Sequence, residues 1–217
     1  MKNMQKAVDR IQTVIANGEK VLVYGDYDVD GTTSVAMMYS FLKKKVKEIE
    51  YYIPCRYDEG YGISLKGIDY AKENNFALII ALDCGIRAVN QVDYANEKGV
   101  DFIICDHHNP GEKVPKALAI LNPKQIDCNY PYKELSGCGV GFKLIQAFSQ
   151  QNNIDFSEIM EYLDLLTVSI GADIVPMTGE NRVFSFYGLQ QINKNPRAGL
   201  KALMEIANKT KEVTITD

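Results

Sequence analysis

Five aspartates and both histidines of the chain stand directly after three short apolar segments: Asp26, Asp28, Asp30, Asp83, Asp106, His107 and His108. Carboxylates in such numbers repel one another strongly where they meet without cations. Aspartate oxygen together with imidazole nitrogen suits manganese, magnesium, iron or zinc. The five cysteines form no C-x-x-C pair, which argues against a structural zinc site. The residue types therefore predict a divalent metal site if the three segments end at one place.

Each of these clusters also has a purely structural interpretation. An aspartate such as Asp83 is by itself typical of a helix N-cap or a turn, and a histidine pair is common in surface loops. Segment 26–31 matches the start of a calcium loop, but that loop needs a glutamate six residues after its glycine, and position 37 is methionine. The metal interpretation is favoured because three independent clusters follow strand-like segments in the same way.

Asp173 is a further expected member of the site. It lies in the otherwise apolar segment 169–176, where an unpaired carboxylate is costly. A bound metal would compensate that cost. The alternatives are an N-cap or an ion pair with Arg182.

The elements that must position these residues alternate along the first part of the chain. Five short apolar segments predict strands at 20–24, 48–53, 77–82, 101–105 and 118–121. Helical periodicity precedes or separates them at 4–17, 32–45, 65–74 and 86–98. This pattern predicts an α/β fold, a five-stranded parallel sheet with helices on both faces. Such sheets bind ligands at the carboxyl ends of their strands, where the acidic clusters fall.

The remainder of the chain predicts a helical portion. Its periodic segments are 139–151, 157–169, 181–193 and 198–208. No linker separates them from the sheet, so we expect one domain with an α/β part at 1–135. The helical part, with the start of a linker, occupies 136–217.

Glycine-containing helix starts predict phosphate contacts. Thr32 follows Gly31 at the start of one helix, and Ser136, Gly137 and Gly139 begin another. Free N–H groups at such ends favour anions, although the spacing is not that of a P-loop. Tight packing of helix on sheet is the alternative reading of these glycines.

Segment 56–62 adds one cation and two aromatic side chains. Arg56 is the expected contact to a substrate phosphate, with a solvated surface charge as the alternative. Tyr57 and Tyr61 are expected either to stack on bases or to pack within the loop.

Composition sets the general class. The chain has 217 residues, a net charge of -4 and 46% hydrophobic residues, as expected of a folded protein without general affinity for nucleic acid. No apolar run reaches the roughly 20 residues of a membrane span, and no secretory core follows Met1. We therefore expect a cytoplasmic protein with reduced thiols.

Several segments together resemble the DHH phosphoesterase superfamily, most closely its RecJ-type single-stranded-DNA exonucleases. They are 23–34, 82–86, 105–108, 135–143 and 172–176, in the family's order. Relatives that act on small substrates resemble H-x-x-x-D-x-D in the first motif. Here Tyr24 stands four residues before Asp28 and Asp26 is added, as in RecJ-like proteins.

The resemblance implies a site for two ions, Mn²⁺ or Mg²⁺. Its implied ligands are Asp28, Asp30, Asp83, His107 and Asp173, with Asp26 in place of the missing histidine and Asp83 bridging. It implies that Asp106 orients a neighbouring histidine and that His108 contacts the scissile phosphate or assists proton transfer. Asp83, Asp106 and His108 are therefore the expected catalytic residues. The expected reaction is in-line attack on the phosphodiester by a metal-activated water.

The implied function is the catalytic domain of a 5′-to-3′ exonuclease for single-stranded DNA in repair and recombination. The family's DHH-associated and OB domains are not found in the sequence, so we expect a fragment with weak processive cleavage. A single-stranded-DNA-binding protein is an expected partner through those domains. The alternatives are a phosphodiesterase for short oligonucleotides or cyclic dinucleotides, and a non-catalytic scaffold.

Overall fold

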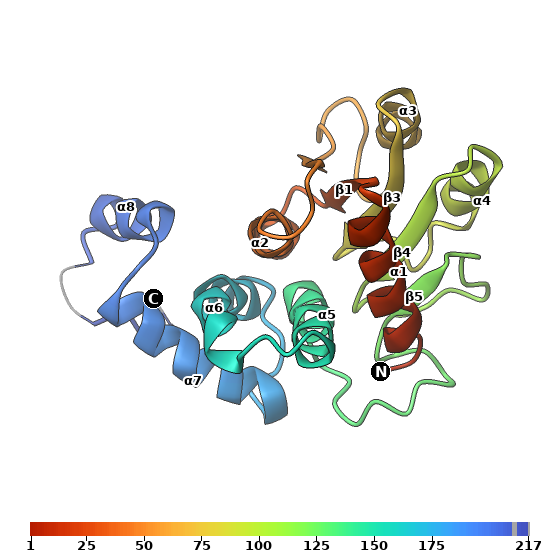
Figure 1. The fold of residues 1–217 in the computed structure, drawn as a ribbon. Helices are drawn as coiled ribbons and strands as arrows, with labels where there is room; N and C mark the ends of the chain where they lie inside the picture. Colours follow the sequence, from red (N-terminus) through yellow and green to blue (C-terminus); the bar gives the residue numbers. More distant parts are fainter. Residues whose placement is uncertain (210–211, 217) are drawn as a thin grey trace.

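The computed structural model describes residues 1–209 and 212–216, and within them it confirms the α/β fold (Figure 1). Five parallel strands form one sheet in the order β2-β1-β3-β4-β5. Their bounds are Lys20–Gly25 for β1, Ile49–Tyr52 for β2, Phe76–Leu82 for β3, Asp101–Cys105 for β4 and Ala119–Leu121 for β5. Each predicted strand is therefore present, with ends that differ by two residues at most.

Helices cover both faces of the sheet, as expected. One face carries α1 (Met4–Asn17), α2 (Val29–Leu42) and α5 (Gly137–Gln151), and the other carries α3 (Leu65–Glu73) and α4 (Val89–Glu97). Side chains along β1 alternate between the two cores. Val21 and Val23 face the first core, whereas Leu22 and Tyr24 face the second. The apolar strands are continuous because both of their faces are buried.

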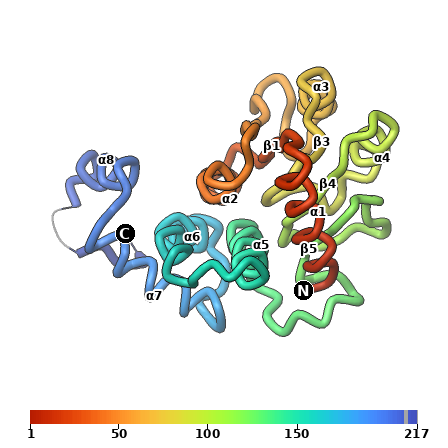
Figure 2. The backbone as a smooth tube through the Cα atoms, viewed as in Figure 1, coloured from red at the N-terminus to blue at the C-terminus, as the bar shows by residue number. Residues whose placement is uncertain are grey.

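The helical C-terminal part extends away from the sheet (Figure 2). It contains α6 (Leu163–Ala172), α7 (Gly179–Lys194) and α8 (Ala198–Ile206), and α6 packs against α2, α5 and α7. No helix in the described part of the chain is both long and apolar enough to cross a membrane.

The expected helix at 157–169 is wrong in its first half. Residues Phe156–Glu158 and Met160–Tyr162 form two 3₁₀ turns, and the α-helix begins only at Leu163. Ile159 and Tyr162 are both buried. Their spacing of three matches the period of a 3₁₀ turn, which brings both side chains to the core.

α8 contributes little to the core. None of its described residues is buried, and Leu203 and Ile206 are exposed. Its N-terminal end is held by Arg197, whose guanidinium lies 2.5 Å and 2.7 Å from the two carboxylate oxygens of the buried Asp164 on α6. This ion pair fixes where α8 begins.

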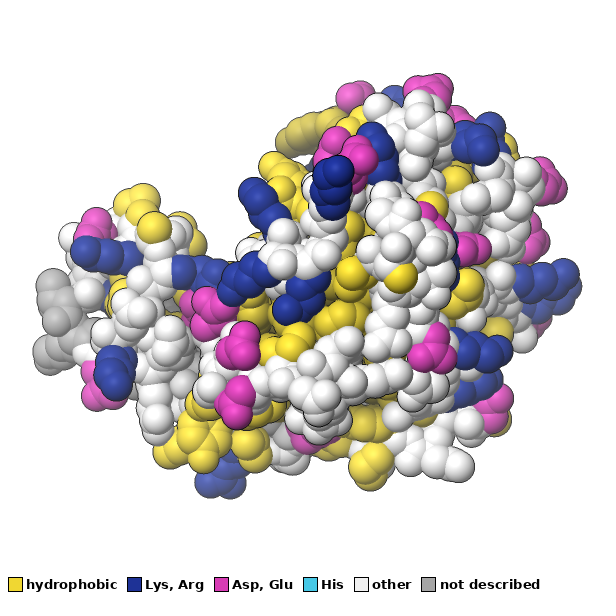
Figure 3. All heavy atoms as spheres, in the orientation of Figure 1, with side chains coloured by type: hydrophobic (Ala, Val, Ile, Leu, Met, Phe, Trp, Pro, Cys, Tyr) yellow, Lys and Arg dark blue, Asp and Glu magenta, His cyan; other side chains and the backbone are white. Residues whose placement is uncertain are grey.

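A cluster of lysines follows the C-terminal end of α2. Lys43, Lys44 and Lys45 come directly after Leu42, and dark blue side chains gather around α2 on the face shown in Figure 3. No histidine is visible on that face. α2 begins at the carboxyl edge of the sheet and runs back toward the other edge, so this basic cluster lies away from His107 and His108.

Candidate metal centre

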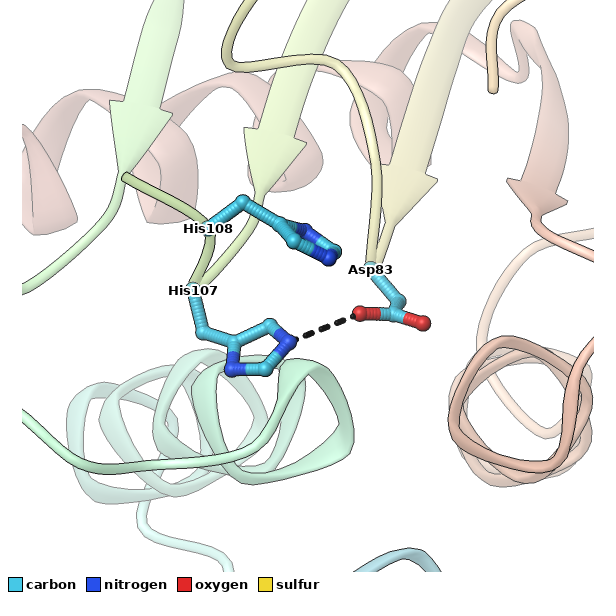
Figure 4. A group of neighbouring side chains, drawn as sticks. All are labelled: Asp83, His107 and His108. Carbon is cyan, nitrogen blue, oxygen red and sulfur yellow. Dashed lines mark ion pairs between the residues drawn. The ribbon is translucent and has the colours of Figure 1, made fainter. Parts of the chain in front are cut away.

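The predicted strand-end residues meet at the carboxyl edge of the sheet. Figure 4 shows Asp83 and the two histidines converging from neighbouring strand ends. Nε2 of His107 lies 3.2 Å from Oδ1 of Asp83. The ligand atoms of Asp83, His107 and His108 all lie within 4.8 Å of one another. The topology thus brings together residues that follow β3 and β4.

A second group of ligand atoms overlaps the first. Nε2 of His107 is 3.8 Å from Oδ2 of Asp30 and 3.6 Å from Oδ2 of Asp173. These three residues again lie within 4.8 Å of one another. Asp173 is the C-cap of α6, and its side chain is 29% exposed, so it is less buried than its apolar neighbours in the sequence indicate. His107 is the residue that the two groups share.

Buried polar atoms at this centre fit a divalent cation. Among the described residues, Oδ1 of Asp83 and both ring nitrogens of His107 are buried without a hydrogen-bond partner. Burial, and then the charges of Asp30, Asp28 and Asp106, raise the pKa of Asp83 to about 10. Leaving such groups unpaired costs roughly 1–3 kcal/mol each, a cost that a bound cation removes. Oxygen and nitrogen donors of this kind suit Mn²⁺, Mg²⁺ and similar ions.

The backbone at Asp83 is in the left-handed region, with φ of 59°. Its N–H donates to the carbonyl of Cys105, which ties the end of β3 to the end of β4. Left-handed backbone is uncommon outside glycine, but aspartate and asparagine adopt it more readily than other residues. The turn directs the carboxylate toward α5, where Gly137 packs against it.

Asp30 is held by the starts of two helices. α2 begins at Val29 and not at 32, because the side chain of Asp28 accepts the N–H of Gly31 and caps the helix. Asp30 therefore lies in the first turn. Its carboxylate accepts the N–H groups of Gly137 and Cys138 at 2.7 Å and 2.8 Å.

The donors at the start of α5 are therefore engaged inside the protein. Gly139 donates its N–H to Oγ of Ser136, and the Ser136 hydroxyl pairs with that of Ser169 at 2.7 Å. Ser136, Gly137 and Gly139 are all buried. In this arrangement the N–H of Gly137 holds Asp30, whereas Gly139 and Ser136 are engaged with each other and with Ser169. A contact from these residues to a substrate phosphate stays a prediction.

Ser169 is a site residue that the sequence interpretation missed. Its hydroxyl donates to Oδ1 of Asp30 at 2.7 Å, and it is fully buried on α6. The available signal was a hydroxyl in a strongly apolar helix, four residues before Asp173. Such a group needs a partner, and here the partner is a site carboxylate.

Asp26 and Asp28 lie beside the two groups and do not belong to either of them. Asp26 is fully buried, and its two oxygens accept the N–H groups of Tyr27 and Gly62. Burial is the main reason that its pKa is raised. Metal ligation by these two aspartates stays a prediction, whereas their contacts show that Asp28 caps α2 and Asp26 ties the loop at 53–64 to the site.

Asp106 and His108 form a close pair. Nδ1 of His108 lies 2.8 Å from Oδ1 of Asp106, which also accepts the N–H groups of both histidines, while Oδ2 accepts that of Ile86. The hydrogen bond and charge of Asp106 raise the pKa of His108. Burial acts to raise the pKa of Asp106, but its bonds to His108 and to the backbone lower it on balance. Asp106 thus orients His108, as expected.

This pair supports a prediction on histidine titration. In Asp106→Asn the carboxylate charge is lost, so we expect the pKa of His108 to fall toward 6.5 or below. The chain has only two histidines, so the imidazole signals in an NMR titration of the metal-free protein can be assigned with His107→Gln. An unchanged His108 titration would show that Asp106 does not set its charge.

The remaining predicted residues lie around the cluster. Thr32 donates its hydroxyl to the carbonyl of Asp28. Arg56 is exposed, with its guanidinium 5.5 Å from the ring centre of Tyr27. Tyr27 contacts Tyr61 edge-to-face, and Tyr61 contacts His108 in the same way. A row of rings thus runs from Arg56 to the metal centre.

Comparisons with known proteins agree with this geometry. The model of the DHH family, N-terminal domain, matches residues 20–170. The RecJ single-stranded-DNA-specific exonuclease of Bacillus subtilis is 43% identical over 208 residues, which are 95% of this chain and 26% of that protein. A crystal structure of exonuclease RecJ bound to manganese has a TM-score of 0.87 at 30% identity, covering 99% of this chain and 55% of that one. The crystal structure of RecJ from Thermus thermophilus in complex with Mg²⁺ has a TM-score of 0.68 at 25% identity. This match covers 96% of this chain and 26% of that one.

The chain thus spans about a quarter of its Bacillus subtilis relative and about half of the manganese-bound RecJ chain. The family match begins at β1 and ends in α6, so it includes the strand ends that carry Asp83, His107 and His108. The sheet, the clustered aspartates and histidines, and the homology to RecJ exonucleases agree, and the chain belongs to the DHH family.

Proposed function

We propose that this chain is the catalytic domain of a RecJ-like exonuclease, a metal-dependent phosphodiesterase that releases nucleotides from single-stranded DNA in the 5′-to-3′ direction. The observation that carries the proposal is the pair of overlapping ligand groups around His107, with buried atoms that lack partners among the described residues. Homology to RecJ exonucleases over 95% of the chain supports the substrate class. Roles in DNA repair and recombination, and a single-stranded-DNA-binding protein as partner, are part of this proposal.

The residues that would hold two Mn²⁺ or Mg²⁺ ions are Asp28, Asp30, Asp83, His107 and Asp173, with Asp26 adjoining them. When bound, such ions lower the pKa of water and neutralise charge on the phosphate. We propose that Asp83 would contact both ions, as the resemblance implies. In the structure, His107 is the residue that the two groups of candidate ligands share.

The protein's own groups then orient the substrate and move the proton. Nδ1 of His108 is engaged by Asp106, which leaves Nε2 free to contact the scissile phosphate or to donate a proton to the leaving oxygen. Arg56 is the proposed contact to a second phosphate, at the far end of the row of rings.

The test uses single-stranded DNA labelled at either end, with Mn²⁺, beside dinucleotides and a cyclic dinucleotide. Asp83→Asn serves as the inactive variant, and Asp58→Asn removes an equal charge from an exposed residue of the 53–64 loop as the matched control. We expect early release of mononucleotides from the 5′ label by the wild type and the Asp58 variant only. Cleavage of dinucleotides without cleavage of the strand would instead assign a small-substrate phosphodiesterase, and manganese binding without any hydrolysis would contradict a self-sufficient catalytic domain.

A further inference from the structure

A cavity of about 300 Å³ adjoins the metal centre on the α4 side of His108. One wall is formed by Tyr61 and Ile63 of the 53–64 loop, and the other by Ile86, Ala88 and Gln91 around the start of α4. The ring of His108 lines it as well, so this histidine faces both the metal cluster and the cavity.

Both walls of the cavity are fixed to the metal centre. The N–H of Gly62 donates to Oδ2 of Asp26 at 2.9 Å, and the N–H of Ile86 donates to Oδ2 of Asp106 at 2.8 Å. Cys84, also at the cavity, directly follows Asp83 in the chain. The cavity walls are therefore tied directly to two carboxylates of the site.

The loop that carries Tyr61 is anchored by a network that takes no part in metal binding. The buried Tyr24 hydroxyl donates to the carbonyl of Gly62 at 2.9 Å and accepts the N–H of Ser64 at 3.1 Å. Glu59 accepts from the hydroxyls of Ser64 and Tyr52 and from the N–H of Cys55, at 2.5, 2.8 and 2.9 Å. These five hydrogen bonds, of which the one between Tyr24 and Ser64 is buried, tie the loop to β1 and to the start of α3.

The lining selects the chemistry of the ligand. Ile63, Ile86 and Ala88 offer apolar contact, and Tyr61 offers a ring for stacking. The amide of Gln91 can both donate and accept hydrogen bonds, and the guanidinium of Arg87, which donates to the carbonyl of Asn109, adds further donors. A planar heterocycle with polar edges matches this combination. The volume of about 300 Å³ is at the lower end of the roughly 300–1,000 Å³ range of ligand sites, so it suits a ligand of the size of one nucleoside.

We propose that this cavity receives the base of the nucleotide that is being released, while its phosphodiester lies at the metal centre beside His108. The proposal rests on the proposed function and deepens it, because it places recognition of the substrate's base in this cavity. Stacking of a base on an aromatic side chain is worth about 5- to 150-fold in affinity.

The first test measures binding and does not depend on hydrolysis. Calorimetric titrations of the manganese-loaded chain compare deoxyadenosine 5′-monophosphate with 2-deoxyribose 5-phosphate, which lacks the base. We expect the nucleotide to bind at least about 5-fold more tightly. Ala88→Phe fills the cavity and should bring this ratio near one. Asn90→Phe adds the same ring at an exposed position of α4 and should preserve the ratio.

Circular dichroism and manganese affinity, measured on each variant, show whether it is folded. If Ala88→Phe is not, the smaller Ala88→Leu replaces it. Equal binding of the two ligands by the wild type, or an unchanged ratio in the folded cavity variant, would overturn the cavity proposal. A wild type that distinguishes the two ligands but hydrolyses no DNA would instead contradict the proposed function and leave the cavity proposal standing.

Discussion

Replacing Asp83 with asparagine is expected to abolish metal-dependent hydrolysis and, at the same time, to stabilise the metal-free protein. Asp83 is 1% exposed, and burial with neighbouring carboxylates raises its pKa to about 10. Asparagine has nearly the same shape, carries no charge and tolerates the φ of 59° at this position. Loss of a residue that only hydrogen-bonds to a metal ligand typically lowers metal affinity by roughly 10- to 100-fold. Because Asp83 is a proposed direct ligand, we expect a larger loss of affinity.

The sign of the stability effect follows from proton binding. In the unfolded chain Asp83 ionises near its usual pKa of about 3.9, whereas the folded metal-free protein retains the proton up to about pH 10. The folded state therefore binds more protons in this window, and its stability falls as pH rises through it. pH 7 lies about three units above the usual pKa of an aspartate, and each unit corresponds to about 1.4 kcal/mol. Keeping Asp83 protonated at pH 7 therefore costs the folded metal-free protein at most about 4 kcal/mol, a cost that asparagine removes.

Thermal unfolding measures the stability effect and the loss of metal binding. We expect the Tm of the metal-free variant to exceed that of the wild type by at least about 2 °C at pH 7, with a smaller difference near pH 4. Excess Mn²⁺ should raise the Tm of the wild type and of Asp58→Asn but not that of Asp83→Asn. A metal-free variant less stable than the wild type across this pH range would contradict the proposed electrostatic cost at Asp83.

Replacing Gly137 with alanine is expected to damage the metal centre by a steric clash, because the added methyl group has no room beside Asp83. A Cβ at this position would lie 2.5 Å from both Cβ and Oδ1 of Asp83 and 2.8 Å from its Cα, closer than real contacts allow. Both residues are buried, and the N–H of Gly137 also holds Asp30. Overpacking typically costs about 1–3 kcal/mol of stability. A displacement of about 1 Å at reacting groups can lower the rate by about 100-fold.

Gly139 supplies the matched control on the same helix. A Cβ there meets Leu135 and Ser136 at 3.3–3.5 Å, which small shifts accommodate. We expect Gly139→Ala to retain most of its manganese affinity, measured by calorimetry, and most of its hydrolysis, whereas Gly137→Ala loses both. Similar behaviour of the two variants would show that the close approach of α5 to Asp83 is not needed for the site.

The sheet and the position of the metal centre could be predicted because both depend on local patterns. Continuous apolar segments mark strands buried on both faces, and parallel order brings their carboxyl ends to one edge. Asp83, His107 and His108 follow directly from that rule. The start of α2 could not be placed as well, since it depends on a hydrogen bond from Gly31 to the side chain of Asp28.

Contacts between distant parts of the chain could not be predicted. The start of α5 has the sequence of an anion site, yet its N–H groups donate to the carboxylate of Asp30. Gly137 and Cys138 are separated from Asp30 by 107 and 108 positions in the sequence. Ser169 reaches the same carboxylate from 139 positions away. A single sequence shows that a helix start is rich in donors, but the partner of those donors is set by how helices pack in space.

We expect α8, which the Arg197–Asp164 ion pair attaches to α6, to unfold locally as a separate unit. Detachment of this helix exposes no buried residue of its own, so its amide hydrogens should exchange with solvent through partial opening and not through global unfolding. Opening still has a cost, because it leaves the Asp164 carboxylate, 1% exposed, without its counter-charge. We therefore expect α8 to open without the metal centre, because the hydrogen bonds that hold Asp30 come from α5 and α6 and none of them involves Arg197.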